Sequence, residues 1–90
     1  MLASITTTKF KRDFKRAKKQ QRDIEELKDI MKKLISQQQL PPKNKDHKLL
    51  GDLHDCRECH VENDWLLIYR KTDTEITFIA LGSHSELFKK

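Results

Sequence analysis

Two apolar stretches in the second half of the chain decide the fold: Trp65-Leu66-Leu67-Ile68-Tyr69 and Thr74-Glu75-Ile76-Thr77-Phe78-Ile79-Ala80-Leu81. The first is apolar at every position, as in a strand covered on both faces, and the second is rich in the β-branched residues that favour strands. A further strand is expected from Arg57. The gaps between the strands, Glu62-Asn63-Asp64 and Lys71-Thr72-Asp73, are short enough for hairpins. The sequence therefore predicts a small antiparallel sheet.

The first half of the chain is predicted to begin with a short strand and a basic helix. Ser4 to Thr8 is rich in β-branched residues and fits a short edge strand. Phe10, Phe14 and Ala17 then recur at the spacing of one helical face, which predicts a helix over about residues 9–20. The remaining surface of this helix is basic.

A second helix is predicted to follow. Asp23, with Glu26 three residues later, fits a capping box at its start. The helix stops before Leu40, because prolines cannot continue it, and the segment from Pro41 to Lys48 is expected to be a polar linker. The apolar residues of this helix recur at helical spacing: Ile24, Leu27, Ile30, Met31, Leu34 and Ile35.

The predicted order of elements is β-α-α-β-β-β. This order indicates an α+β fold, in which an N-terminal short strand and a helical hairpin pack on a small antiparallel β-sheet. Gly82 breaks the last strand, and the segment from Ser83 to Phe88 is long enough for a short C-terminal helix. We expect one domain spanning residues 1–90.

Positive charge is concentrated in the first half of the chain. Residues 1–45 hold 13 Lys and Arg against 5 Asp and Glu, whereas residues 46–90 hold 6 against 9. Such an uneven charge attracts polyanions, most often nucleic acid; the alternative is a solvated helix face that only aids solubility. We expect RNA contacts from the basic side of the first helix, at Lys11, Arg12, Lys15 and Lys18.

The sequence contains no signal for a membrane or for export. No apolar run approaches the ~18 residues of a transmembrane helix, and the N-terminus lacks the charged and apolar regions of a signal peptide. We therefore expect a cytoplasmic protein without membrane contact. Cys56 and Cys59 are expected to stay reduced in that compartment.

The run Cys56-Arg57-Glu58-Cys59-His60 matches the C-x-x-C-H signature of c-type haem attachment, and with His54 it also resembles part of a zinc site. Haem attachment of this type needs export. If the segment is a strand, residues three apart point to opposite faces, so Cys56 and Cys59 could not hold one ion. We therefore expect two reduced cysteines in the sheet, no metal and no cofactor.

Five segments in the second half form a combined motif. They are Lys45-Asp46-His47, Leu50-Gly51, Arg57-Glu58-Cys59-His60-Val61, Asp64-Trp65-Leu66-Leu67-Ile68-Tyr69 and Leu81-Gly82-Ser83-His84-Ser85-Glu86-Leu87-Phe88. In order and spacing the motif resembles the YafQ branch of the RelE/ParE toxin superfamily. Over the N-terminal half the resemblance is one of element pattern only.

The resemblance implies a RelE-like fold and the toxin of a bacterial type II toxin–antitoxin system. Members of this branch enter the ribosomal A site and cut mRNA there. The implied partners are a cognate DinJ-type antitoxin, the 70S ribosome and its mRNA, with operator DNA reached only through the antitoxin complex.

The residue types of the motif suit cleavage of RNA without a metal. A base must take the proton of the attacking 2′-hydroxyl, an acid must protonate the leaving 5′-oxygen, and a cation should stabilise the phosphate charge. By resemblance, His47, His60, Asp64 and His84 occupy catalytic positions. We assign His84 as the acid, His47 or Asp64 as the base, and His60 to orienting the phosphate or holding a neighbouring residue in place.

Several other residues have more than one candidate role. Trp65 and Phe88 match aromatic or apolar family positions, where they either pack the site or stack on an RNA base. Trp65 and Tyr69 also fit a core role, and Cys59 a structural one. His54 matches no family position that we can name.

Ala80 departs from the family pattern. The residue two before the glycine of the Gly82-Ser83-His84 run is usually an arginine, the natural clamp for the scissile phosphate. Three explanations are open: an engineered inactive variant, a natural protein that is weakened or dead, or replacement by another cation. The candidate cations are Arg70, Lys71, Arg57 and Lys48.

Two other functions compete with the nuclease. One is a catalytically silent module of the same fold that binds antitoxin and RNA, which Ala80 favours and the retained histidines oppose. The other is a ParE-like gyrase inhibitor, a branch that generally lacks this histidine set.

Overall fold

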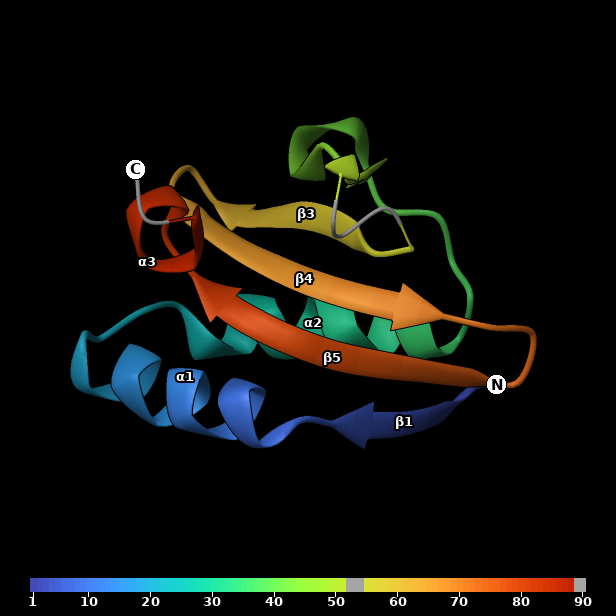
Figure 1. The fold of residues 1–90 in the computed structure, drawn as a ribbon, viewed down its shortest axis with the longest axis horizontal. Helices are drawn as coiled ribbons and strands as arrows, with labels where there is room; N and C mark the ends of the chain where they lie inside the picture. The colour runs from blue at the N-terminus through green and yellow to red at the C-terminus, as the bar shows by residue number, and fades with distance from the viewer. Residues whose placement is uncertain (52–54, 89–90) are drawn as a thin grey trace.

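The computed structural model describes residues 1–51 and 55–88, which form a five-stranded sheet with three helices (Figure 1). The strand order is β1-β5-β4-β3-β2. From β2 to β5 all neighbouring pairs are antiparallel, as predicted, but β1 pairs with β5 in parallel. A parallel pair needs a long connection, and β1 and β5 are joined through two helices and three other strands. The strands are β1 (Ala3–Thr6), β2 (His47–Lys48), β3 (Arg57–Glu62), β4 (Trp65–Lys71) and β5 (Glu75–Gly82).

The helices are α1 (Thr8–Lys19), α2 (Ile24–Ile35) and α3 (His84–Phe88), close to their predicted bounds. The predicted strand over residues 4–8 ends earlier, because the Thr7 hydroxyl caps α1 by accepting the Phe10 N–H at 3.0 Å. Asp23 caps α2 by accepting the Glu26 N–H at 3.0 Å, as the capping box predicted. None of the helices in residues 1–51 and 55–88 is long and apolar enough to span a membrane.

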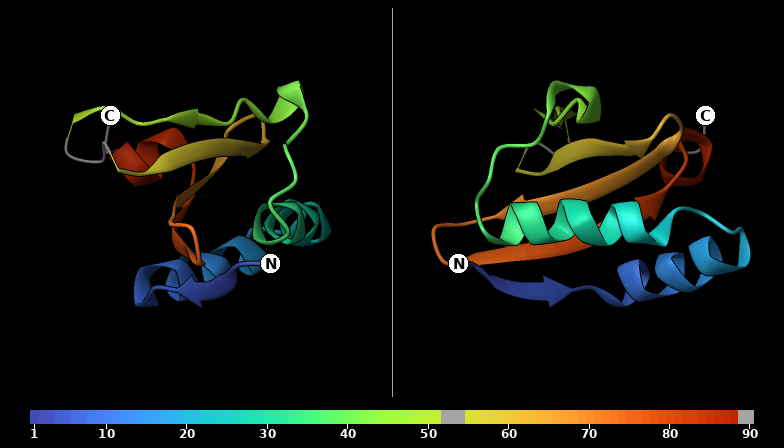
Figure 2. Two further views of the ribbon diagram at one scale, coloured as in Figure 1. Left: turned by 90° about the vertical axis from the view of Figure 1, so that its right-hand side faces the viewer. Right: turned by 180° about the vertical axis from the view of Figure 1, so that it is seen from behind.

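The two faces of the sheet are covered differently. On one face, here called the helical face, α1 and α2 bury the main core, and the views of Figure 2 show α2 lying across the sheet. On the opposite face, α3 packs over a smaller apolar cluster that includes Cys56, Ile68 and Ala80. The side chains that α1, α2 and the sheet contribute to the main core include Phe10, Ala17, Leu27, Ile30, Leu34, Trp65, Leu67, Tyr69, Ile76, Phe78 and Leu81.

A β-bulge at Ile79 decides which residues of β5 face the second side. Tyr69 pairs with Phe78 and Ile68 pairs with Ala80, so Ile79 is an extra residue. Ile79 and Ala80 therefore both lie on the opposite face. Two side chains from α1 and its N-cap supply hydrogen-bond partners for the backbone around the bulge. Buried Asp13 accepts the Leu81 N–H at 3.0 Å, and the Thr7 hydroxyl donates to the Ile79 carbonyl at 2.7 Å.

The predicted linker between α2 and the sheet has defined structure. It contains the 3-10 helix η1 (Pro42–Asn44) and then β2, the edge strand that carries His47. Asn44 is buried and donates to the His60 carbonyl at 2.8 Å, and Lys45 adopts a left-handed backbone with φ of 47°. These contacts hold the linker beside β3, where sequence patterns predicted only a polar connection.

Candidate active site

The register of the sheet gathers polar residues on the opposite face. His47 of β2, Glu58 of β3, Ile68 of β4 and Ala80 of β5 stand directly opposite one another in consecutive strands. Residues paired in this way point to the same face. His60 lies two residues after Glu58 on β3 and so shares that face. Residues that are far apart in the sequence are thereby placed in one small area.

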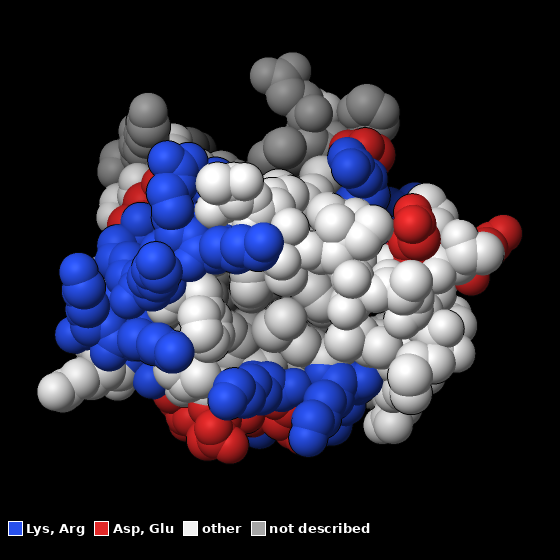
Figure 3. Space-filling view, turned by 90° about the horizontal axis from the view of Figure 1, so that it is seen from below, with Lys and Arg blue, Asp and Glu red and all other residues white. Residues whose placement is uncertain are grey.

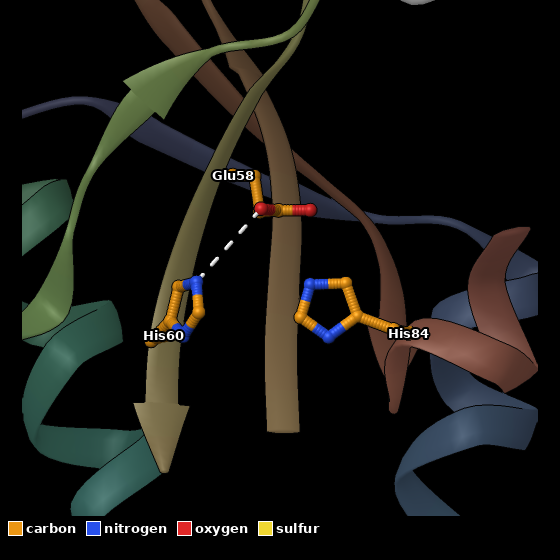
Figure 4. Close-up of side chains that lie close together, drawn as sticks. All are labelled: Glu58, His60 and His84. Carbon is orange, nitrogen blue, oxygen red and sulfur yellow. Dashed lines mark ion pairs between the residues drawn. The ribbon is translucent and has the colours of Figure 1, made fainter. Parts of the chain in front are cut away.

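Glu58 lies at the centre of this area and was missed by the sequence reasoning. Its carboxylate is nearly buried, and Oε2 lies 3.3 Å from Nε2 of His47. The same oxygen lies 4.0 Å from Nε2 of His60 (Figure 4). Burial of a carboxylate is costly unless charged or hydrogen-bonding partners compensate it, and here the two imidazoles take that role. Its position two residues before His60 in a predicted strand was the signal that could have identified it.

His47 is held from both sides of its ring. Its Nδ1 lies 2.6 Å from the carbonyl oxygen of Lys45, and its Nε2 faces Glu58. A carbonyl oxygen can only accept, so Nδ1 carries a proton and Nε2 is the nitrogen that exchanges protons with its surroundings. Lys45 has a left-handed backbone, and its carbonyl oxygen contacts Nδ1 at the edge of the ring. The linker therefore positions His47.

His84 is held by Asp64. One carboxylate oxygen of Asp64 accepts the His84 backbone N–H at 3.0 Å and contacts Nδ1 of its ring at 2.9 Å. These hydrogen bonds hold the pKa of Asp64 below its ordinary value. Because a carboxylate accepts and does not donate, Nδ1 is protonated and Nε2 is left for chemistry. Asp64 is thus placed to orient His84, which argues against the alternative that Asp64 is the base.

The rings of His60 and His84 face each other across the site. Their centroids lie 5.9 Å apart, and their planes meet at 64°. The half-buried ring of Phe88 lies 6.4 Å beyond His84, where it packs beside the site as expected. Within the described ranges, one ligand atom each from Glu58, His60 and His84 lies within 4.8 Å of the others, and Figure 4 shows the three side chains converging.

The helix that carries His84 is anchored to α1. Glu86 accepts the Ser83 N–H at 2.8 Å and also pairs with Nε of Arg16 at 3.2 Å. The hydrogen bond from Ser83 is the main reason that the pKa of Glu86 is lowered from its ordinary value of 4.5. Arg16 in addition donates to the Leu81 carbonyl at 3.1 Å. The position of His84 therefore depends on contacts from both β5 and α1.

The basic side of α1 is exposed as predicted. Figure 3 shows Lys and Arg side chains gathered over one part of the molecular surface, and the exposed residues of α1 include Lys11, Arg12, Lys15 and Lys18. The ion pair between Arg16 and Glu86 joins this helix to α3. The basic helix and the helix that carries His84 are thus in direct contact.

Trp65 does not take the predicted role of an RNA contact. Its side chain is 1% exposed in the main core, on the helical face, and the Arg22 guanidinium lies 5.7 Å above its ring. The core interpretation is the right one, because β4 is the central strand and is covered on both faces. Tyr69 is likewise in the core, and its hydroxyl donates to Asp46 at 2.8 Å.

Cys59 lies in β3 as predicted, whereas Cys56 directly precedes that strand. Cys56 belongs to the cluster on the opposite face and Cys59 to the main core, so the two thiols lie on different sides of the sheet. Both are free and buried, and burial raises the pKa of Cys59 to about 12. Residue His54, the third member of the possible zinc site, lies outside the described residues.

Residues 2–89 match the model of a family described as the bacterial toxin of a type II toxin–antitoxin system, YafQ. The chain belongs to the YafQ toxin family. The mRNA interferase toxin YafQ of Escherichia coli K12 is 41% identical over 80 residues, which are 88% of this chain and 87% of the relative.

Solved structures of the YafQ family agree with the fold. The E. coli DinJ–YafQ toxin–antitoxin complex contains a chain with a TM-score of 0.90 and 38% identity, covering 97% of each chain. A metal-bound toxin from Helicobacter pylori has a TM-score of 0.91 and 42% identity, covering 98% of this chain and all of the other. The resemblance to the YafQ branch is thereby confirmed, and membership of this family sets the ParE-like gyrase inhibitor aside.

Proposed function

We propose that this member of the YafQ family is a ribosome-dependent endoribonuclease that cuts mRNA in the A site. The observation that carries the proposal is the pair of facing imidazoles, His60 and His84, each beside a carboxylate. In this arrangement His60 can bind a phosphate oxygen while His84 protonates the leaving oxygen of the same phosphodiester. The E. coli relative is named an mRNA interferase toxin, which supports the same activity here.

The proposed reaction needs no cofactor. His47 takes the proton of the 2′-hydroxyl on Nε2, and Glu58 stabilises the imidazolium that forms. The 2′-oxygen then attacks the adjacent phosphorus, while His60 binds a phosphate oxygen. His84, held by Asp64, donates the proton of its Nε2 to the leaving 5′-oxygen. This assignment keeps His84 as the acid and chooses His47 over Asp64 as the base.

The proposed partners follow from the family and from the charge. The DinJ-containing complex of the E. coli relative supports a DinJ-type antitoxin as the partner that inhibits this chain, with operator DNA contacted only through that complex. The exposed lysines and arginine of α1 suit the phosphates of ribosomal RNA and mRNA. These partners place the proposed activity in the cytoplasm.

The experiment that tests the proposal compares this chain with its Ala80→Arg variant on programmed ribosomes, with the cut ends of the mRNA mapped. Cleavage in the A site by this chain is the expected result. Cleavage by the variant alone would show that Ala80 disables the site. Absence of cleavage from both proteins, with antitoxin binding intact, would favour the silent binding module.

A second candidate function is the binding of a transition-metal ion, favoured by the cluster of Glu58, His60 and His84. Two imidazole nitrogens and a carboxylate oxygen suit zinc or copper, and their mutual distances within 4.8 Å need only small side-chain shifts to meet one ion. The metal-bound toxin from H. pylori supports this possibility. An ion there would occupy the imidazoles needed for proton transfer.

The metal proposal is tested by titrating zinc or copper into the purified chain and into a His84→Gln variant. Stoichiometric binding that is weakened in the variant is expected, together with loss of RNA cleavage as the ion binds. Equal binding by both proteins would place the ion elsewhere.

A further inference from the structure

The structure indicates which cation replaces the arginine that Ala80 lacks. The Ala80 side chain is 4% exposed and ends in a methyl group, so it brings no charge to the scissile phosphate. A phosphodiester under attack gains negative charge, and a fixed cation close to it lowers the barrier. If the proposed nuclease is active, another cation of the chain must reach the same face of the sheet.

Three of the four cations considered from the sequence point to the helical face. Arg57 pairs in register with the core residue Tyr69, and its Nε is bonded to Asp46 at 3.1 Å. Lys48 stands opposite Arg57 and so shares its side of the sheet. Lys71 lies two residues after Tyr69 on β4 and also belongs to that side.

Arg16 comes close to the site but its charge is already compensated. Its guanidinium pairs with Asp13 at 3.3 Å and with Glu86 at 3.2 Å, and it donates to the Leu81 carbonyl at 3.1 Å. Releasing it would break the contacts that hold α3. Arg16 is therefore an anchor of the site and not its phosphate-binding cation.

Arg70 is the remaining candidate, and it lies on the correct face. It follows Ile68 by two residues on β4, and Ile68 stands between Glu58 and Ala80 in the row that crosses the site. Glu58 and Arg70 are thus diagonal neighbours on adjacent strands, about 7–8 Å apart and within reach of a long side chain. Arg70 is also a diagonal neighbour of Ala80, because Ala80 pairs with Ile68, the residue two before Arg70 on β4.

The side chain of Arg70 is free to turn toward a substrate. It is 48% exposed, and its ion pair with Asp55 is 3.4 Å long between two half-exposed groups. Exposed pairs of this kind contribute little stability, so a phosphate can replace Asp55 at small cost. The planar fork of a guanidinium matches the geometry of a phosphate and can bind two of its oxygens.

We propose that Arg70 is the catalytic cation that binds the scissile phosphate in this chain, in place of the arginine usual at position 80. The assignment rests on the proposed nuclease activity and adds a residue to its machinery. It explains how the site can act although Ala80 carries no charge.

The test is single-turnover cleavage on programmed ribosomes by this chain, Arg70→Gln, Lys71→Gln and the double variant Arg70→Gln with Ala80→Arg. Lys71 is the matched control, because it is the next residue on β4 and points to the other face. Arg70→Gln is expected to cut about 100-fold more slowly. Lys71→Gln should cut at the parent rate, and the double variant should recover most of the loss.

The outcomes separate this inference from the proposed function. Equal rates for this chain and Arg70→Gln would overturn the role of Arg70 and leave the nuclease standing. Cleavage by an Ala80→Arg variant but not by this chain would also overturn it, because Arg70 would then not supply the missing charge. No cleavage by any of the proteins would overturn the nuclease itself.

Discussion

One oxygen of Asp64 contacts both the backbone N–H and the ring Nδ1 of His84, at 3.0 and 2.9 Å. The two residues are 20 positions apart, one in the β3–β4 turn and the other at the start of α3. The contact fixes the ring orientation of His84 and leaves Nε2 as the nitrogen that can give its proton to RNA. An exposed turn therefore controls the chemistry of the proposed acid.

Replacing Asp64 with Asn is expected to lower cleavage by about 100-fold, because the neutral amide lacks the negative charge that stabilises the doubly protonated ring of the acid. The folding stability should change little, since Asp64 is exposed. Single-turnover rates and thermal melting measure the two effects. Asp73→Asn, another exposed aspartate in a hairpin turn, is the control; a parent-like rate for Asp64→Asn would refute the orienting role.

Glu58→Gln tests the carboxylate that the sequence analysis missed. The change keeps the size of the side chain but removes the charge beside His47 and His60. We expect at least a tenfold slower cleavage, and thermal melting checks that the variant is folded, because removing one partner of a buried charge pair costs stability. Glu62→Gln, at the exposed end of the same strand, should leave the rate unchanged. If both variants cut alike, Glu58 has no part in the reaction.

The basic side of α1 is expected to set the salt dependence of ribosome binding. Each phosphate contact releases counterions, so fewer contacts flatten the plot of log affinity against log salt. The variant replaces Lys11, Arg12, Lys15 and Lys18 with glutamine, and its affinity is measured at several salt concentrations. Glutamine at Lys28 and Lys33 of α2, which pair with carboxylates, is the control. An unchanged slope in the α1 variant would exclude α1 as the RNA-facing surface.

Glu86 is expected to make the stability of the protein depend on acid pH. Its pKa is lowered in the folded state from the ordinary 4.5, chiefly by the Ser83 N–H. The stability that this shift contributes is therefore present above pH 4.5 and is lost as the pH falls through the lower folded pKa. Denaturant unfolding at several pH values should show a shallower acid decline for Glu86→Gln. A decline identical to that of the parent would contradict this assignment.

The sequence predicted most elements because their patterns are local. The helical spacing of Phe10, Phe14 and Ala17 and the apolar run of β4 were sufficient for α1 and for the central strand. The parallel pairing of β1 could not be predicted, because it depends on where a long connection returns. The bulge at Ile79 was also missed, since it is stabilised by Asp13 and Thr7 from another element.

Local motifs in the sequence identified some candidate site residues, whereas others depend on contacts between strands. The histidines were found through the family motif, whereas Glu58 and Arg70 acquire their roles only from strand register. Trp65 was assigned to RNA contact through its family position, with a core role as the alternative, but α1 and α2 cover that face of β4 and bury it. Cross-strand neighbours are therefore the information that the sequence lacked.

Metal-free attack by the 2′-hydroxyl is tested by the chemistry of the cut ends. The mRNA fragments released on programmed ribosomes are analysed by mass spectrometry. Attack by the 2′-oxygen leaves a 2′,3′-cyclic phosphate, or its opened product, on the upstream fragment and a 5′-hydroxyl on the downstream one. A 3′-hydroxyl together with a 5′-phosphate would show that water attacked instead, and would contradict the roles proposed for His47 and His84.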